Sequence, residues 1–301
     1  MQRIAYFGPA GTFTEAATGA LVDVSAVELV PAATPPAAMQ LVRDGLADAA
    51  CVPIENSVEG PVPPTMDALA TGSRLQVVAE TVLPVRFSVL VRPGTAAADV
   101  SSVRTHPHAA AQVHRWLGEH LPQASLTLAD STAAAAEDVA AGRADASVST
   151  ALVGARLGLV ALAEDVADVR DAATRFVLVT RPCPPPPRTG ADRTAVVLSL
   201  ISAPGALVTA MAEFAVRGID LTRIESRPTR TGLGTYRFYL DCTGHVDDPL
   251  VADAIAALHR RCTEVRFLGS WPAAEASPGL APPDPTSSTD WVTALREGTG
   301  R

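Results

Sequence analysis

The sequence predicts an α/β protein with two folded modules, a larger one over residues 1–181 and a smaller one over residues 192–271. In the larger module, short apolar runs alternate with alanine-rich helical stretches, which is typical of a largely parallel sheet covered by helices. Between the modules, residues 182–191 hold five prolines and are expected to be a semi-rigid linker, because proline lacks an N–H donor and favours extended backbone. Residues 272–301 are rich in proline, glycine and serine, and are expected to form a flexible tail with a short helix near residues 290–296.

The larger module opens with an expected strand at residues 4–7, a glycine turn at residues 8–11 and a helix that begins at Thr12. Thr12 and Glu15 have the spacing of a capping box, in which each side chain accepts a backbone N–H of the first turn. The same unit returns three times, with strands expected at residues 100–104, 126–128 and 146–148 and helices ending near His120, Gly142 and Gly158. Further strands are expected at residues 75–83, 85–91 and 176–179. We interpret residues 86–165 as an inserted lobe, so that a ligand cleft lies between two lobes.

The smaller module has the predicted element order β-α-β-β-α-β, which is the ferredoxin-like arrangement. Gly218 is expected to end its first helix, and a glycine-rich turn at residues 231–234 separates the two central strands. The expected elements, in order, are strand 195–201, helix 205–216, strands 219–227 and 236–241, helix 249–260 and strand 265–268.

Composition excludes several kinds of chemistry. The chain of 301 residues has a formal charge of −8, and all 24 of its Lys+Arg side chains are arginine. The absence of lysine excludes a Schiff base, a pyridoxal-phosphate anchor and a P-loop, and the acidic balance argues against a nucleic-acid partner. The cysteines at positions 51, 183, 242 and 262 fit neither a disulfide framework nor a metal site. With no signal peptide and no apolar run of about 18 residues, the protein is expected to be cytoplasmic and to have no membrane partner.

Three segments of the larger module carry polar side chains where a strand meets a loop. In residues 8–14, glycines allow a ligand to approach closely, and the helix that follows presents free N–H groups to an anion. Residues 52–62 place a carboxylate, an amide and a hydroxyl in succession after an apolar strand, which packing alone does not explain. In residues 173–176, Thr174 can donate a hydrogen bond and Arg175 can bind a carboxylate through two N–H groups.

Together these segments resemble the prephenate dehydratase family. Residues 8–14 are similar to its Gly-Pro-x-Gly-(Thr/Ser)-(Phe/Tyr)-(Ser/Thr) opening, residues 53–57 to its Pro-Ile-Glu-Asn-(Ser/Thr) loop, and residues 174–176 to its Thr-Arg-Phe motif, in the same order. The hydroxyl-rich stretches at residues 130–134 and 149–152 also fit this pattern. The lysine-free, arginine- and alanine-rich composition resembles an actinobacterial member. Because no helical extension stands ahead of Met1, we expect a monofunctional enzyme without the fused chorismate mutase of some relatives.

The resemblance implies a carbon–oxygen lyase whose catalytic domain has two lobes, as in type II periplasmic binding proteins, and which needs no metal or other cofactor. Such an enzyme converts prephenate to phenylpyruvate. The implied catalytic residues are Thr174, which donates to the leaving oxygen, Arg175, which binds a carboxylate or fixes the loop, Phe176, and Glu55, a candidate general acid. The implied substrate-binding residues are Thr12, Phe13, Asn56, Ser57, Ser131, Thr132, Ser149 and Thr150, with Asn56 and Ser57 beside Glu55 on the wall opposite Thr174.

One position departs from the family pattern. Many members carry asparagine two residues before the threonine of the Thr-Arg-Phe motif, where this chain has Ala172, so an amide that supports Thr174 is missing or comes from elsewhere. Residues 105–107 correspond to a Ser-His-Pro-like stretch, and we expect His106 and His108 to cap a helix rather than to act in catalysis.

The smaller module resembles an ACT regulatory domain, which implies that phenylalanine is an effector and that the protein is a homodimer or homotetramer. Phenylalanine is expected to bind between Gly205, Ala206, Leu207 and Val208 of one subunit and Glu225, Ser226, Arg227 and Pro228 of a partner. Two other functions stay open from the sequence: an arogenate dehydratase, which acts on the transaminated substrate, and a non-catalytic sensor of two small molecules.

Overall fold

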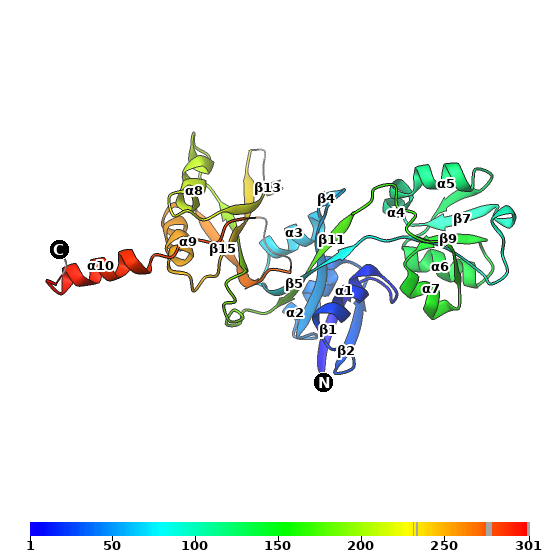
Figure 1. Cartoon of the computed structure of the whole chain (residues 1–301), viewed down its shortest axis with the longest axis horizontal. Helices are drawn as coiled ribbons and strands as arrows, with labels where there is room; N and C mark the ends of the chain where they lie inside the picture. The colour runs from blue at the N-terminus through cyan, green and yellow to red at the C-terminus, as the bar shows by residue number, and fades with distance from the viewer. Residues whose placement is uncertain (231, 233, 275–278, 300–301) are drawn as a thin grey trace. The chain divides into compact units, whose positions relative to one another are not determined.

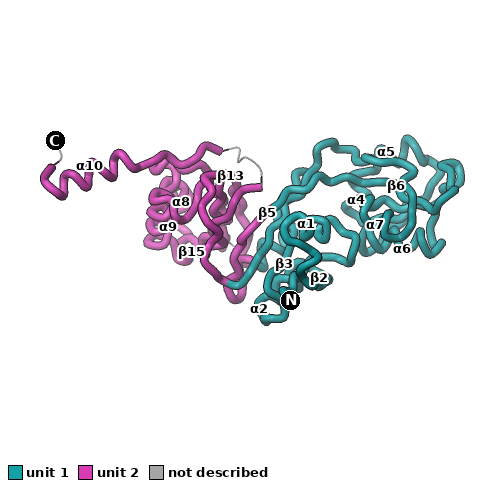
Figure 2. The backbone as a smooth tube through the Cα atoms, turned by 60° about the horizontal axis from the view of Figure 1, so that its bottom comes forward, with its two compact units in different colours: residues 1–68, 81–181 teal, residues 69–80, 182–301 magenta. Residues whose placement is uncertain are grey.

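The computed structural model describes all residues except 231, 233, 275–278 and 300–301, so that Thr231 and Leu233 of the expected glycine-rich turn lie outside the described residues. The chain forms two compact units, shown in different colours in Figure 2. The first unit comprises residues 1–68 and 81–181, and the second comprises residues 69–80 and 182–301.

The first unit contains a sheet in the order β2-β1-β3-β11-β5, with β4 beside β3, and residues 81–84 are the part of β5 that belongs to this unit. Strand β1 is parallel to β2 and β3, whereas β11 runs antiparallel to β3. Because its central strands carry apolar side chains on both faces, Ile4, Val52 and Val177 are fully buried. The strands are Gln2–Phe7 (β1), Val27–Ala32 (β2), Ala49–Asn56 (β3), Gly60–Pro61 (β4), Gln76–Pro84 (β5) and Ala173–Thr180 (β11), and the helices are Phe13–Leu21 (α1), Pro35–Arg43 (α2) and Pro63–Ala70 (α3).

A second sheet of the same unit has the order β10-β6-β9-β7-β8. Helices α4 and α5 cover one of its faces, and α6 and α7 cover the other (Figure 1). Consecutive residues of β6 divide between the two faces, because Val89 packs with α4 and α5 whereas Leu90 packs with α6 and α7. The elements are β6 Ser88–Val91, β7 Ser102–Thr105, α4 Pro107–Gln112, α5 His114–His120, β8 Ser125–Leu128, α6 Thr132–Ala140, β9 Ala146–Ser149, α7 Ala151–Leu157 and β10 Val160–Ala163, with a 3-10 turn at Ala97–Asp99.

The expected helix from Pro107 towards His120 is two helices, and the break has a physical cause far away in the sequence. The carboxylate of Asp168 accepts the backbone N–H groups of Arg115 and Trp116 at 2.9 and 3.0 Å, so these groups are not used by a continuous helix. The backbone N–H of Asp168 also donates to the carbonyl of Gln112 at 2.7 Å. Asp168 therefore fixes the junction between α4 and α5.

The second unit contains a four-stranded antiparallel sheet in the order β13-β14-β12-β15, and its elements follow in the predicted order β-α-β-β-α-β. Val196 and Leu240 of the sheet pack against Phe214 of α8 and Leu258 of α9. The bounds are Asp192–Ser199 (β12), Ala206–Ala215 (α8), Leu221–Pro228 (β13), Tyr236–Thr243 (β14), Pro249–Arg261 (α9) and Glu264–Pro272 (β15).

Residues 69–80, expected in the larger module, group with the second unit because several side chains hold them there. Gln76 Nε2 donates to the carbonyl of Cys183 at 2.9 Å, and Arg193 lies 3.4 Å from the buried carboxylate of Glu80. Part of the expected flexible tail is also held, since Thr243 donates to the carbonyl of Leu280 at 2.8 Å. The tail helix α10 spans Thr286–Arg296 and so begins earlier than expected. Among the described residues, no helix is both long and apolar enough to cross a membrane.

Candidate active site

The antiparallel pairing of β3 with β11 brings the expected loop and the Thr-Arg-Phe segment side by side. Thr174 is the cross-strand neighbour of Asn56, and Arg175 is the neighbour of Glu55. Glu55 and Asn56 therefore lie on the same wall as Thr174, and their expected place on the opposite wall is wrong.

Asn56 fixes the hydroxyl of Thr174. Asn56 Nδ2 donates to Thr174 Oγ1 at 2.9 Å, while Asn56 Oδ1 accepts the backbone N–H groups of Val58 and Glu59 at 2.8 and 3.0 Å. These two N–H groups determine which end of the amide is the oxygen, so Thr174 Oγ1 must accept from Asn56. The proton of the Thr174 hydroxyl is then directed away from Asn56. The supporting amide comes from Asn56 although residue 172 is alanine.

Arg175 is buried and ion-paired with Glu55. Its side chain is 7% exposed, and Nη2 lies 3.0 Å from Glu55 Oε2. The register of β11 against β3 shifts between Arg175 and Phe176, and a shift of this kind can change the direction in which a side chain points. Because Glu55 contacts the guanidinium of Arg175 directly, this geometry favours a role for Glu55 in orienting Arg175 over a role as general acid.

Two further predicted residues of this wall have structural contacts. Phe176 is 2% exposed and packs in the interior, so the structure does not offer its ring to a ligand. Ser57 Oγ accepts the backbone N–H of Ala173 at 2.9 Å, and the Ser57 N–H donates back to the Ala173 carbonyl at the same distance. Ser57 thus holds the loop after β3 against the start of β11.

The expected capping box at Thr12 is wrong in its partners. The Thr12 hydroxyl makes no cap and donates to the carbonyl of Pro9 at 3.2 Å, while the carboxylate of Glu15 accepts the N–H of Gly11. Its other oxygen lies 3.0 Å from Arg156 of the inserted lobe, and this ion pair draws the carboxylate towards α7.

The glycine turn contacts the inserted lobe directly. Thr150, the N-cap of α7, donates its hydroxyl to the carbonyl of Gly11 at 2.8 Å and accepts the N–H of Val153 at 3.3 Å. Gly11 has φ +91°, and a Cβ there would lie 2.8 Å from Val153 Cγ2. The glycine therefore allows the two lobes to approach each other. The hydroxyl proton of Thr150 is used in the bond to the Gly11 carbonyl.

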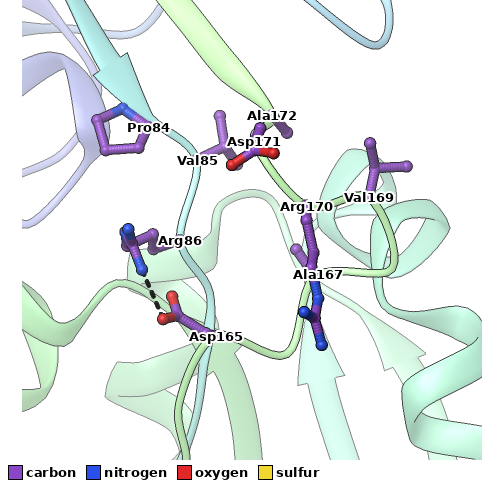
Figure 3. A pocket seen from close by; sticks show the side chains of 9 residues that line it. All are labelled: Pro84, Val85, Arg86, Asp165, Ala167, Val169, Arg170, Asp171 and Ala172. Carbon is purple, nitrogen blue, oxygen red and sulfur yellow. Dashed lines mark hydrogen bonds and ion pairs between the residues drawn. The ribbon is translucent and has the colours of Figure 1, made fainter.

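Two cavities lie where the lobes meet. One of about 370 Å³ is bounded by the two crossing segments, residues 84–86 and 165–172, with Arg86 paired to Asp165 (Figure 3). The other, of about 440 Å³, is lined by three predicted substrate-binding residues, Thr12, Phe13 and Thr150, together with Ser88. Neither cavity is lined by Thr174 or Arg175, so the structure brings the predicted residues together in two groups.

The remaining predicted hydroxyls lie at one edge of the second sheet. Ser131 caps α6 by accepting the N–H of Ala134 at 2.9 Å, and Thr132 is the first residue of that helix. Ser149 ends β9 and is fully buried, and its hydroxyl has no hydrogen-bond partner among the described residues. Because β7, β8 and β9 are parallel neighbours, their carboxyl ends share this edge, where N–H groups of α6 can meet an anion.

These segments match a known family. The family model described as prephenate dehydratase matches residues 4–184, which is more than half of the chain. The chain belongs to the prephenate dehydratase family. Membership makes it an enzyme of the carbon–oxygen lyase class, as the sequence motifs implied.

Relatives of the prephenate dehydratase family match over the whole length. A prephenate dehydratase of Mycolicibacterium vanbaalenii is 59% identical over 314 residues, which cover 99% of each chain. The structure of the Arthrobacter aurescens prephenate dehydratase in complex with L-Phe has a TM-score of 0.90 and 43% identity, covering 98% of this chain and 100% of that one. A second solved structure, described as a quorum-quenching acylase, has a TM-score of 0.80 and 30% identity, covering 90% of this chain and 98% of that one.

Sequence reasoning missed one group of side chains in this chain. Glu59, in the loop after β3, contacts both His108 and Gln112 of α4. His106 caps α4 as expected by accepting the N–H of His108, but His108, also expected to cap, contacts Glu59 instead. Burial, together with the nearby His108 ring, lowers the pKa of His106. The spacing of His108 and Gln112 by four residues was a signal that they share one helix face.

Proposed function

We propose that the chain catalyses the decarboxylating dehydration of prephenate to phenylpyruvate, with Thr174 beside the leaving hydroxyl. In this reaction the bond to the ring carboxylate breaks and its electron pair forms the new ring π bond. The bond to the ring hydroxyl breaks as well, and the departing oxygen takes up a proton to leave as water. The protein must therefore supply a hydrogen-bond donor at that oxygen.

The observation that carries this proposal is the direction of the hydrogen bond between Asn56 and Thr174. Because Oγ1 accepts from Asn56 at 2.9 Å, the Thr174 proton is available to the leaving oxygen. An alcohol is a poor acid, so the role of Thr174 is to polarise the carbon–oxygen bond by hydrogen bonding as negative charge develops on oxygen. A fixed donor costs no reorganisation when the reaction occurs.

Prephenate carries two carboxylates, and we propose that arginine and helix N-termini bind them in this lysine-free chain. Arg175 is the arginine of the Thr174 wall, and Glu55 holds its guanidinium at 3.0 Å. Helices α1 and α6 begin next to the predicted hydroxyls of Thr12, Ser131 and Thr132, and helix N-termini favour negative charge.

We further propose that the second unit is an ACT domain whose ligand is phenylalanine. Gly205 precedes α8 with φ +78°, a conformation that favours glycine and lets backbone N–H groups approach a carboxylate. Val208 in the first turn is 71% exposed and offers an apolar contact to an aromatic ring. Strand β13 carries residues 225–228 at the sheet edge, where a second subunit can lie alongside. The solved relative from Arthrobacter aurescens is in complex with L-Phe.

The test is a steady-state assay that follows the absorbance of phenylpyruvate after prephenate is added, with arogenate assayed in parallel. We expect turnover of prephenate and a change in rate when phenylalanine is present. Prephenate that decays only at its spontaneous rate would overturn the proposed activity, and faster turnover of arogenate would reassign the substrate. Isothermal titration with no heat of phenylalanine binding would remove the regulatory role.

A further inference from the structure

The loop after β3 makes contacts that the proposed chemistry does not use. Glu59 Oε1 accepts from Gln112 Nε2 at 2.9 Å, and Glu59 Oε2 contacts His108 Nδ1. His108 and Gln112 lie one helical turn apart on α4, so a single carboxylate reaches both. Both oxygens of one side chain in the first sheet's loop therefore contact the same helix of the inserted lobe.

The backbone of Glu59 is bonded to the candidate active site. Its N–H donates to Asn56 Oδ1 at 3.0 Å, and Asn56 Nδ2 donates to Thr174 Oγ1 at 2.9 Å. A shift of residue 59 would move the acceptor end of the Asn56 amide, and with it the donor that orients the Thr174 hydroxyl.

Helix α4 is a fixed support for Glu59. The carbonyl of Gln112, its last residue, accepts the N–H of Asp168 at 2.7 Å, and the carboxylate of Asp168 caps the start of α5. Asp168 belongs to the segment that leads to Thr174 in the sequence. The helix is thus held at its C-terminal end, and the side chain of Glu59 binds the face that carries His108.

We infer that Glu59 is a positioning residue, which ties α4 of the inserted lobe to the Asn56–Thr174 pair and so orients the Thr174 hydroxyl. The inference rests on the proposed function, in which that hydroxyl faces the leaving oxygen. The side chain of Glu59 is one-third exposed, and both of its contacts are made by the carboxylate. Hydrogen bonds to an ionised carboxylate are stronger than those between neutral groups. In this role Glu59 acts through Asn56 and does not touch the substrate.

The test compares Glu59→Ala, Glu59→Gln and the control Glu119→Ala, which removes an exposed carboxylate of α5. Glu59→Ala is expected to lower kcat for prephenate about tenfold and to change the melting temperature little. Glu59→Gln is expected to recover most of kcat, because its amide oxygen still accepts from Gln112. Glu119→Ala is expected to retain the wild-type kcat and KM.

A double-mutant cycle supplies the second readout. If Glu59 acts through α4, His108→Ala should lower kcat less in the Glu59→Ala background than it does in the wild-type protein. Three results would each overturn the role of Glu59. They are wild-type kinetics for Glu59→Ala, additive effects of the two substitutions on kcat, and a loss of kcat that is fully explained by a loss of folded protein. An inactive wild-type protein would instead overturn the proposed function.

Discussion

Asn56 Nδ2 donates to Thr174 Oγ1 at 2.9 Å, and the two residues face each other across the antiparallel pair of β3 and β11. Neither side chain reaches this geometry through local sequence, because 118 positions separate them. The pairing gives the Thr174 hydroxyl a defined orientation before substrate arrives, which is the arrangement that transition-state stabilisation needs.

Thr174→Ala should lower kcat on prephenate by at least about tenfold, or about 1.4 kcal/mol of barrier. The half-buried hydroxyl contributes little to packing, so the melting temperature should change little. Thr174→Ser keeps the hydroxyl and is the matched control, which should retain most of the activity. Near-wild-type turnover of the alanine variant would remove Thr174 from the mechanism.

Arg175→Gln should raise KM for prephenate about tenfold or more, because a carboxylate of the substrate loses its charged partner. Arg175→Lys should fail to restore KM, since a point charge does not reproduce the planar fork of guanidinium. Steady-state kinetics of Glu55→Gln provide the comparison. A smaller rise in KM for Glu55→Gln is expected, because Arg175 keeps its charge but loses the partner that orients it. If Arg175→Gln leaves KM unchanged, Arg175 does not bind substrate.

Gly11→Ala should destabilise the protein more than Gly94→Ala. Both glycines have positive φ, at +91° and +88°, so both alanine variants carry a backbone cost of about 1–2 kcal/mol. Only at Gly11 does the new Cβ meet another side chain, at 2.8 Å from Val153, which adds about 1–3 kcal/mol. Urea unfolding measures the free energy of unfolding of both variants. Equal losses would show that the close contact of Gly11 with Val153 does not contribute to the cost of the substitution.

Thiol labelling of the native protein should modify Cys183 first. Cys183 is exposed, whereas burial raises the pKa of Cys51 to about 12 and also raises the pKa of Cys242. The thiolate is the reactive form, so the two buried thiols should stay unmodified at pH 8 until the protein is denatured. Peptide mass mapping after iodoacetamide treatment identifies the labelled positions. Rapid modification of Cys51 in the folded state would contradict this burial.

Local patterns were enough to predict several elements that position the site. The apolar run at residues 146–148 predicted a strand, and the stretch up to Gly158 predicted a helix. The structure has β9 and α7 there, and Thr150 is the N-cap, which accepts the N–H of Val153. Ser131 caps α6 in the same way, by accepting the N–H of Ala134. These features depend on hydrogen bonds over three residues, which the sequence displays directly.

Features that depend on distant contacts could not be predicted in this way. The place of Glu55 beside Arg175 follows from the register of two strands far apart in the sequence, which no local pattern specifies. No proline or glycine marks the break between α4 and α5 in the sequence. The break is caused by Asp168, which lies 53 positions after Arg115. The grouping of residues 69–80 with the second unit likewise depends on Cys183 and Arg193.

The hydrogen bond from Thr150 to the carbonyl of Gly11 restricts how the cleft of the first unit can open. The lobes are also joined by two chain crossings, by the ion pair of Glu15 with Arg156 and by the contacts of Glu59 with α4. The Thr150 bond adds an attachment at a glycine, where the two backbones approach closely. If the cleft widens, the lobes must either break the hydrogen bond between Thr150 and Gly11 or rotate about it. An opening that separates Thr150 from Gly11 therefore costs the free energy of this hydrogen bond, which is about 0.5–1.5 kcal/mol.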